Sequence, residues 1–169
     1  REPARPMKVV AVTFDDALRS AFALGAPVAE EFGVPFGMFA ITKPPEQYTP
    51  SVAGWEEMRE YAASGAWVIG SHLHEAHTEA QVDKEGKDFR WPQPNPVRQG
   101  PAKNRLESMN EWDKRMRSEF RLSRKVLREK MGEEDSPVAL VAYPYGDIGQ
   151  EDSCNLSLLR NPTQSILSE

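Results

Sequence analysis

The sequence predicts an α/β fold built on parallel strands, and three observations support this prediction. Short β-branched apolar runs alternate with longer segments whose apolar residues recur at helical spacing. Each helical segment is followed by a glycine, the residue at which helices commonly stop. The chain of 169 residues is long enough for one domain with a sizeable core. Such alternation favours a parallel sheet with right-handed crossovers.

The first half of the chain contains three predicted strands with helices between them. The predicted elements are, in order, a strand at 8–14, a helix ending at Gly33, a strand at 34–42, a loop at 43–54, a helix at 55–65 and a strand at 66–72. The strands are apolar runs of the type found in buried parallel sheets. Apolar residues at helical spacing indicate the first helix, namely Leu18, Phe22, Ala26, Ala29 and Phe32.

The second half begins with a long polar segment and continues with the longest predicted helix. Residues 78–105 carry four of the chain's prolines, and a loop of this length in a compact domain is often functional. The helix at 107–131 ends before Gly132. Its residues predicted to face the core are Met109, Trp112, Met116, Phe120 and Leu127. A fourth strand at 137–143 then leads into "PYGDIGQ".

Composition narrows the class of protein. Charged residues make up 28% of the chain and apolar residues 39%, so we expect one soluble domain over residues 1–169. The net charge of -5 argues against a nucleic acid or an anionic membrane as partner. The longest apolar runs fall far short of the roughly 20 residues that span a bilayer, and "REPARPMK" has no signal-peptide core. A single cysteine excludes an internal disulfide and a cysteine-based zinc site.

The residues able to do chemistry gather at one predicted edge of the sheet. Asp15 and Asp16 follow the first strand, the histidines follow the third, and "YPYG" at 143–146 follows the fourth. The carboxyl ends of parallel strands meet at one edge, and active sites of such folds gather there. The sequence therefore predicts a site formed by these three segments.

The histidines of the chain are His72, His74 and His77, and their clustering indicates a metal site. Two histidines and a carboxylate from a neighbouring strand would leave coordination positions open for water and substrate. His72 and His74 share a face of an extended strand, whereas His74 and His77 adjoin only on a helix. His72 and His77 converge only if the chain turns after the strand. The spacing leaves all three pairs open.

The "TFDD" stretch supplies two adjacent carboxylates, and successive side chains of a strand point in opposite directions. One of Asp15 and Asp16 can therefore face a metal while the other acts as a general base toward water. Either aspartate could instead simply cap the helix that begins near Ala17. The turn at 143–146 can present backbone N–H groups to an oxyanion, although such a tetrapeptide is more often only a loop.

Taken together, "VTFDD", "SHLHEAH" and "YPYG" resemble the first three motifs of polysaccharide deacetylases, the NodB-like carbohydrate esterases. Their form is most similar to the deacetylases of poly-β-1,6-N-acetylglucosamine, a biofilm exopolysaccharide. The motifs span residues 12 to about 149, which is most of the chain. The resemblance implies a distorted (β/α) barrel, incomplete or open in this chain, and a periplasmic, cell-surface or extracellular location.

The resemblance also implies a mechanism. It makes Asp15 the general base. The metal ligands are then Asp16, His72 and His77, holding one divalent ion, with zinc as the first choice and nickel, cobalt or iron as alternatives. The ion would polarise the acetamide carbonyl and the attacking water.

The remaining site residues follow from the same resemblance. The backbone N–H of Tyr145 would stabilise the tetrahedral oxyanion, and Tyr143 and Pro144 would contact the substrate, an amino-sugar polysaccharide. His74 falls on a position that is not a ligand, where it would contact sugar or support the site from behind.

Some positions depart from the family pattern. Ala17 replaces a usual glycine, Leu73 a usual serine or threonine, and Ala142 an arginine that many members have. The family also uses a further histidine as general acid, and only His74 is left for that role because all histidines lie within 72–77. We therefore expect a truncated deacetylase domain or one that has lost part of its machinery. The alternatives are a non-catalytic carbohydrate-binding or scaffolding module, or a deacetylase of xylan, chitin or peptidoglycan.

Overall fold

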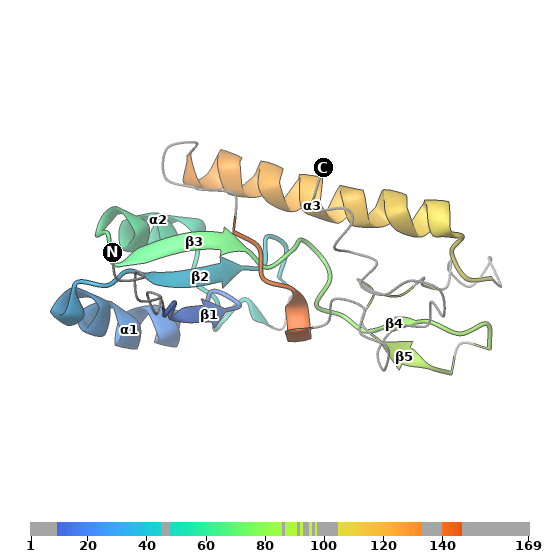
Figure 1. Ribbon diagram of the computed structural model, residues 1–169, viewed down its shortest axis with the longest axis horizontal. Helices are drawn as coiled ribbons and strands as arrows, with labels where there is room; N and C mark the ends of the chain where they lie inside the picture. Colours follow the sequence, from blue (N-terminus) through green and yellow to red (C-terminus); the bar gives the residue numbers. More distant parts are fainter. Residues whose placement is uncertain are drawn as a thin grey trace, which may run out of the picture.

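The computed structural model is built around a parallel sheet of three strands in the order β1-β2-β3 (Figure 1). The strands are β1 (Thr13–Asp15), β2 (Phe36–Ala40) and β3 (Trp67–Ser71). Asp15 pairs with Phe39, and Ala40 pairs with Ser71, so the strands end side by side at one edge. The structure describes residues 10–44, 48–85, 87–90, 92, 95, 97, 105–132 and 140–146.

Two helices form the crossovers between the strands, and both have clear boundaries. Helix α1 (Arg19–Phe32) ends at Gly33, whose left-handed φ of 61° is readily adopted by glycine. Helix α2 (Trp55–Ala63) follows Gly54, whose N–H donates to the Glu57 carboxylate at 2.6 Å. The third and longest helix, α3 (Met109–Met131), starts at the capping residue Ser108.

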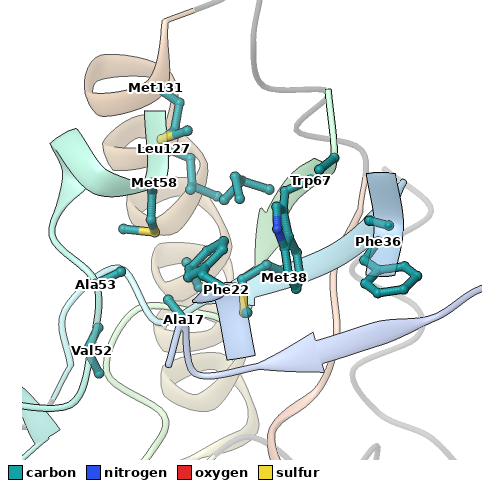
Figure 2. Close-up of a cluster of buried hydrophobic side chains, with 14 residues drawn as sticks. Ala17, Phe22, Phe36, Met38, Val52, Ala53, Met58, Trp67, Leu127 and Met131 are labelled. Carbon is teal, nitrogen blue, oxygen red and sulfur yellow. The ribbon is translucent and has the colours of Figure 1, made fainter. Parts of the chain in front are cut away.

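The main core lies between one face of the sheet and these helices (Figure 2). Phe36, Met38 and Ala40 are buried at alternate positions of β2, as expected for a strand with one face against helices. Phe22 of α1 meets the Trp67 ring edge-on, with ring centroids 4.8 Å apart. The burial of these large side chains is the main stabilising contribution to the fold.

Helix α3 contacts both α2 and β3, and it carries a second apolar cluster near its first half. Residues 140–142 run parallel to the end of β3 on the side away from β2. The Ser71 N–H donates to the Leu140 carbonyl, and the Ala142 N–H donates to the Ser71 carbonyl, both at 2.9 Å. This pairing brings the segment 143–146 to the carboxyl edge of the sheet, where the short 3-10 turn η2 (Pro144–Gly146) lies (Figure 1).

The predicted parallel α/β fold is confirmed, with boundaries that differ by a few residues. The described strands form an open sheet and not a closed barrel. Of the predicted first strand, Thr13 and Phe14 are in β1, and residues 8–9 lie outside the described residues. Of the predicted fourth strand, Val141 forms a bridge to Ser71, and residues 137–139 lie outside the described residues. In the described part of the chain, no helix is apolar over enough length to cross a lipid bilayer.

Two further details of the prediction were wrong. Met109 was expected in the core but is 41% exposed, because it is the first residue of α3 and lies beyond the packed stretch. The predicted loop 78–105 contains a small antiparallel hairpin of β4 (Ala80–Gln81) and β5 (Phe89–Arg90), strands too short to show an alternating pattern.

Candidate metal centre

Sharp backbone turns follow the strands at the carboxyl edge. Asp15 is the last residue of β1, and His72 directly follows β3. Asp16, Ala17 and Leu73 adopt positive φ values of 66°, 56° and 66°, a conformation that is unfavourable for residues other than glycine. Strained backbone of this kind concentrates at functional sites, where the chain must turn to bring side chains together.

Asp16, His72 and His77 form a group whose potential ligand atoms all lie within 4.8 Å of one another. Asp16 Oδ1 is 3.5 Å from His77 Nε2 and 3.7 Å from His72 Nε2. Two imidazoles and one carboxylate are typical donors for zinc and related divalent ions. Three protein ligands also leave positions for water and substrate, as catalytic sites require.

The orientation of His72 is fixed by a backbone carbonyl. Its Nδ1–H donates to the carbonyl oxygen of Ala142 at 3.0 Å, so the lone pair of the neutral ring is on Nε2. Nε2 is also the atom that lies near Asp16. Metal-binding histidines usually make this second hydrogen bond, which fixes the tautomer and the ring orientation.

His77 provides the strongest test of whether a cation fits the site. Its ring is buried, and neither ring nitrogen makes a hydrogen bond. Burial lowers the pKa of His77 from 6.5 to about 3, and His72 adds to this effect, so the ring is neutral at ordinary pH. Buried polar atoms without a partner are unfavourable. A cation bound by the lone pair of one nitrogen would relieve that penalty, so the residues present fit a divalent metal.

The carboxylates of both aspartates lie within 4 Å of His72 Nε2, at 3.8 Å for Asp15 and 3.7 Å for Asp16. Burial raises the pKa of Asp16, which His72 counteracts and the Asp15 carboxylate reinforces. Asp15 Oδ2 is 3.8 Å from His72 Nε2, and the Asp15 side chain is 53% exposed. Asp15 is therefore beside the three potential ligands and open to solvent.

His74 lies apart from this cluster. Its Nδ1 is 2.8 Å from the Thr42 hydroxyl, and its backbone N–H donates to Glu119 at 3.0 Å. Of the three histidine pairs that the spacing left open, the structure brings together His72 and His77, whose ring centroids are 4.6 Å apart. The turn at Leu73 is what lets this pair converge.

The predicted turn at 143–146 is at the same edge. Tyr145 has a φ of 59°, is 51% exposed, and has its ring centroid 5.9 Å from that of His77. Partial burial raises the pKa of Tyr145, with Tyr48 and Asp16 contributing. Pro144 is buried, and the Tyr143 ring meets Phe120 edge-on at 6.3 Å. The proposed contacts of these three residues with substrate stay predictions.

Sequence reasoning missed two residues that support the site, Thr42 and Glu119. Glu119 lies in α3, with its carboxylate accepting hydrogen bonds from the N–H groups of His74 and Glu75. A signal for it existed in the sequence. Glu119 occupies a position on the buried stripe of α3, where a charged residue is unusual unless it has partners.

The fold and the site together define a parallel α/β protein in which three residues able to hold a metal ion meet at the carboxyl edge of the sheet. A family model described as polysaccharide deacetylase matches residues 2–157. The chain belongs to the polysaccharide deacetylase family, which confirms the family inferred from the three motifs. A sequence comparison with curated proteins finds no match.

Several solved structures share the fold. A de-N-acetylase from Aggregatibacter actinomycetemcomitans is 21% identical with a TM-score of 0.72, over 86% of this chain and 58% of its own. The BpsB deacetylase domain from Bordetella bronchiseptica is 21% identical with a TM-score of 0.71, over 92% and 58%. IcaB from Ammonifex degensii is 25% identical with a TM-score of 0.62, over 97% and 57%. The chain thus spans less than two thirds of the length of these structures.

Proposed function

We propose that this protein is a metal-dependent hydrolase that removes N-acetyl groups from an N-acetylglucosamine-containing polysaccharide. The single observation that carries the proposal is the convergence of Asp16, His72 and His77 beside the exposed carboxylate of Asp15. Membership of the polysaccharide deacetylase family supports a polysaccharide as the substrate class. The amino-sugar substrate is the finer part of the proposal, suggested by the similarity to the de-N-acetylase of A. actinomycetemcomitans.

In this proposal, three residues bind the metal ion and a fourth transfers a proton. Asp16, His72 and His77 would hold the divalent ion, zinc first, with nickel, cobalt or iron as alternatives. What such an ion supplies when bound is Lewis acidity toward the acetamide carbonyl and water. Asp15 accepts the proton of the attacking water, because its exposed carboxylate lies next to the ligands without being one of the three.

The surrounding residues hold the substrate and the developing charge. The backbone N–H of Tyr145 donates to the oxyanion of the tetrahedral intermediate, while Tyr143 and Pro144 line the approach of the sugar. We assign His74 a supporting role and not a metal-binding one, because its Nδ1 is hydrogen-bonded to the Thr42 hydroxyl. His74 is nevertheless the one histidine outside the ligand set, so a general-acid role would fall to it within this chain.

Metal content and acetate release test the proposal directly. Purified protein is expected to bind about one divalent ion per chain, and Asp16→Ala, His72→Ala or His77→Ala should each lose it. Acetate release from N-acetylglucosamine oligomers should depend on added metal. A protein with metal content at background level after incubation with zinc, nickel, cobalt or iron contradicts the proposal.

The Asp15→Asn variant separates proton transfer from metal binding. It should keep the metal and lose deacetylation by about 100-fold or more, the usual contribution of a general base. Turnover at the wild-type rate would remove the general-base assignment from Asp15.

A second candidate is a non-catalytic carbohydrate-binding or scaffolding module. It is favoured by one observation, the absence of any histidine outside residues 72–77 that could act as general acid. Binding of the glycan without acetate release from metal-loaded protein would decide for it. A panel of xylan, chitin and peptidoglycan substrates separates the first proposal from a related deacetylase with the same metal chemistry.

We also infer the wider setting of the site from the family. The sheet would be part of a distorted (β/α) barrel, which the parallel order of β1, β2 and β3 supports. The protein would act in the periplasm, at the cell surface or outside the cell, where an exported polysaccharide is found. The single domain over residues 1–169 stays a prediction.

A further inference from the structure

The segment between His72 and His77 packs against helix α3. It leaves the strand at Leu73, whose side chain is fully buried and whose φ is 66°. The apolar cluster around Leu73 consists of Ala76, Trp112 and Met116, with Phe120 and Val141 at its border. Apolar packing of this kind holds the segment on the helix, but it does not by itself fix the direction of the peptide groups.

Glu119 of α3 fixes the direction of two of these peptide groups. Its side chain is 9% exposed, and Oε2 accepts hydrogen bonds from the N–H groups of His74 and Glu75, each at 3.0 Å. Within the described residues, no cationic side chain pairs with this carboxylate. The two N–H groups are therefore what satisfies a buried charge that would otherwise be strongly unfavourable.

The two polar residues on the buried face of α3, Glu119 and Ser123, both make hydrogen bonds to residues 71–75. The stripe consists of Trp112, Met116, Glu119, Ser123, Leu127 and Met131. The Ser123 hydroxyl lies 2.5 Å from the Ser71 hydroxyl, which in turn accepts a hydrogen bond from the Leu73 N–H at 3.1 Å. Both polar members of an otherwise apolar stripe thus bind residues 71–75. A purely structural helix would gain more from an apolar residue at position 119.

We propose that Glu119 is a positioning residue for the metal centre. It holds the two peptide groups on either side of His74, and this fixes His77 relative to His72. The inference rests on the proposed metal site at Asp16, His72 and His77. Residues that orient ligands in this indirect way commonly change metal affinity by about 10- to 100-fold when they are replaced.

The test is the equilibrium affinity for Zn²⁺, measured by competition with a chelator, together with the absorption spectrum of the Co²⁺-loaded protein. Glu119→Leu removes the acceptor and should weaken Zn²⁺ binding by about 10- to 100-fold and change the Co²⁺ spectrum. Glu119→Gln keeps an oxygen acceptor at the same reach. It should restore both the affinity and the spectrum close to those of the wild type.

Two further variants control for stability. Leu127→Ala, on the same face of α3 but in the main core, should destabilise the protein and leave the Zn²⁺ affinity of the folded chain unchanged. Glu119→Asp keeps the charge and withdraws it by one methylene, so it should weaken Zn²⁺ binding even if Glu119→Leu does not fold.

Wild-type affinity and spectrum in Glu119→Asp would overturn the positioning role, as would an equal loss of affinity in Leu127→Ala. Zn²⁺ binding that is lost in His77→Ala but kept in Glu119→Leu would overturn only this inference. A wild-type protein that does not bind Zn²⁺ or Co²⁺ would overturn the proposed function and the positioning role with it.

Discussion

The two ends of the parallel sheet are built in opposite ways. Near the amino ends, Phe14, Phe36 and Trp67 bring their ring centroids within 5.4 to 5.8 Å of one another, and apolar packing dominates. At the carboxyl ends, Asp16 Oδ1 lies 3.5 Å from His77 Nε2, and both nitrogens of the buried His77 ring lack hydrogen bonds. The apolar packing at the amino ends stabilises the folded state, whereas the unpaired polar atoms at the carboxyl ends destabilise it.

Backbone conformation follows the same division. In the described part of the chain, the non-glycine residues with positive φ are Asp16, Ala17, Leu73 and Tyr145. All of them lie after strands or in the turn η2 at the carboxyl edge, and each such conformation costs about 1 kcal/mol or more. The strain is therefore concentrated where Asp16, His72 and His77 converge, and the apolar end offsets it.

The largest expected effect is a loss of stability caused by a substitution at the apolar end. Phe22→Ala removes a fully buried ring that stacks on Tyr61 at 4.7 Å, and it should reduce the free energy of unfolding by about 3–5 kcal/mol. Urea denaturation of the metal-free protein measures this. The Zn²⁺ affinity of the folded variant, measured without denaturant, should equal that of the wild type. A large loss of affinity would show that the two ends are not separable.

Substitutions at two glycines, one near each end of the sheet, test whether stability and Zn²⁺ affinity can be changed separately. A Cβ on Gly70 would lie 2.9 Å from both the Leu140 carbonyl oxygen and the Phe39 ring, so we expect Gly70→Ala to shift the segment that carries the Ala142 carbonyl bound by His72. We expect a destabilisation of about 1–3 kcal/mol and weaker Zn²⁺ binding. Denaturation and chelator competition measure the two effects.

Gly25→Ala is the control for that variant. Its Cβ would lie 2.7 Å from the Trp67 ring, within the apolar end, while helix propensity returns about 1 kcal/mol. It should be destabilising, though less than Gly70→Ala, and its Zn²⁺ affinity should be that of the wild type. Equal effects of both variants on affinity would contradict the division.

The apolar end was largely predictable from the sequence, because its signals are local. β-branched runs and glycine stops placed β2, α1 and α2 within a few residues of their observed bounds. Position within an element was harder to predict. Helical spacing gave Met109 the same weight as Met116, although the first residue of a helix lies beyond the neighbours that would cover it.

The sequence led to the residues that meet at the carboxyl edge but not to those that support them, and the role of the former as metal ligands stays a prediction. The residues Asp16, His72 and His77 were identified through motif resemblance, whereas spacing alone left three histidine pairs open. The deciding feature is the left-handed turn at Leu73, a residue whose type gives no hint of that conformation. Glu119 is 42 or more residues away in sequence from each of these three residues, so only the packing of α3 reveals it.

A smaller effect is expected from His77→Leu, which tests whether the site costs stability. Both nitrogens of this buried ring lack hydrogen bonds, so an apolar side chain of similar size should stabilise the metal-free protein by about 1 kcal/mol. The same variant should lose Zn²⁺ binding. Denaturation in the presence of a chelator measures the first effect. A destabilised metal-free variant would mean that His77 contributes packing that leucine cannot replace.

The smallest effect is a pH dependence of stability, and it arises from the same ring. Burial holds the pKa of His77 at about 3 in the folded chain, whereas the unfolded chain takes up the proton near 6.5. Between these values the unfolded state binds more protons, so the stability contributed by the neutral ring falls as pH falls from 6.5 toward 3.

Between pH 7 and pH 6 this loss should amount to less than about 1 kcal/mol in the metal-free wild type, and it should be absent from His77→Leu. Urea denaturation of both proteins at the two pH values gives the difference directly, since every other titrating group is common to them. A parallel pH dependence in the two proteins would mean that the folded chain protonates His77 near its ordinary pKa. The carboxyl edge would then be better hydrated than its burial indicates, and its polar atoms would not oppose folding.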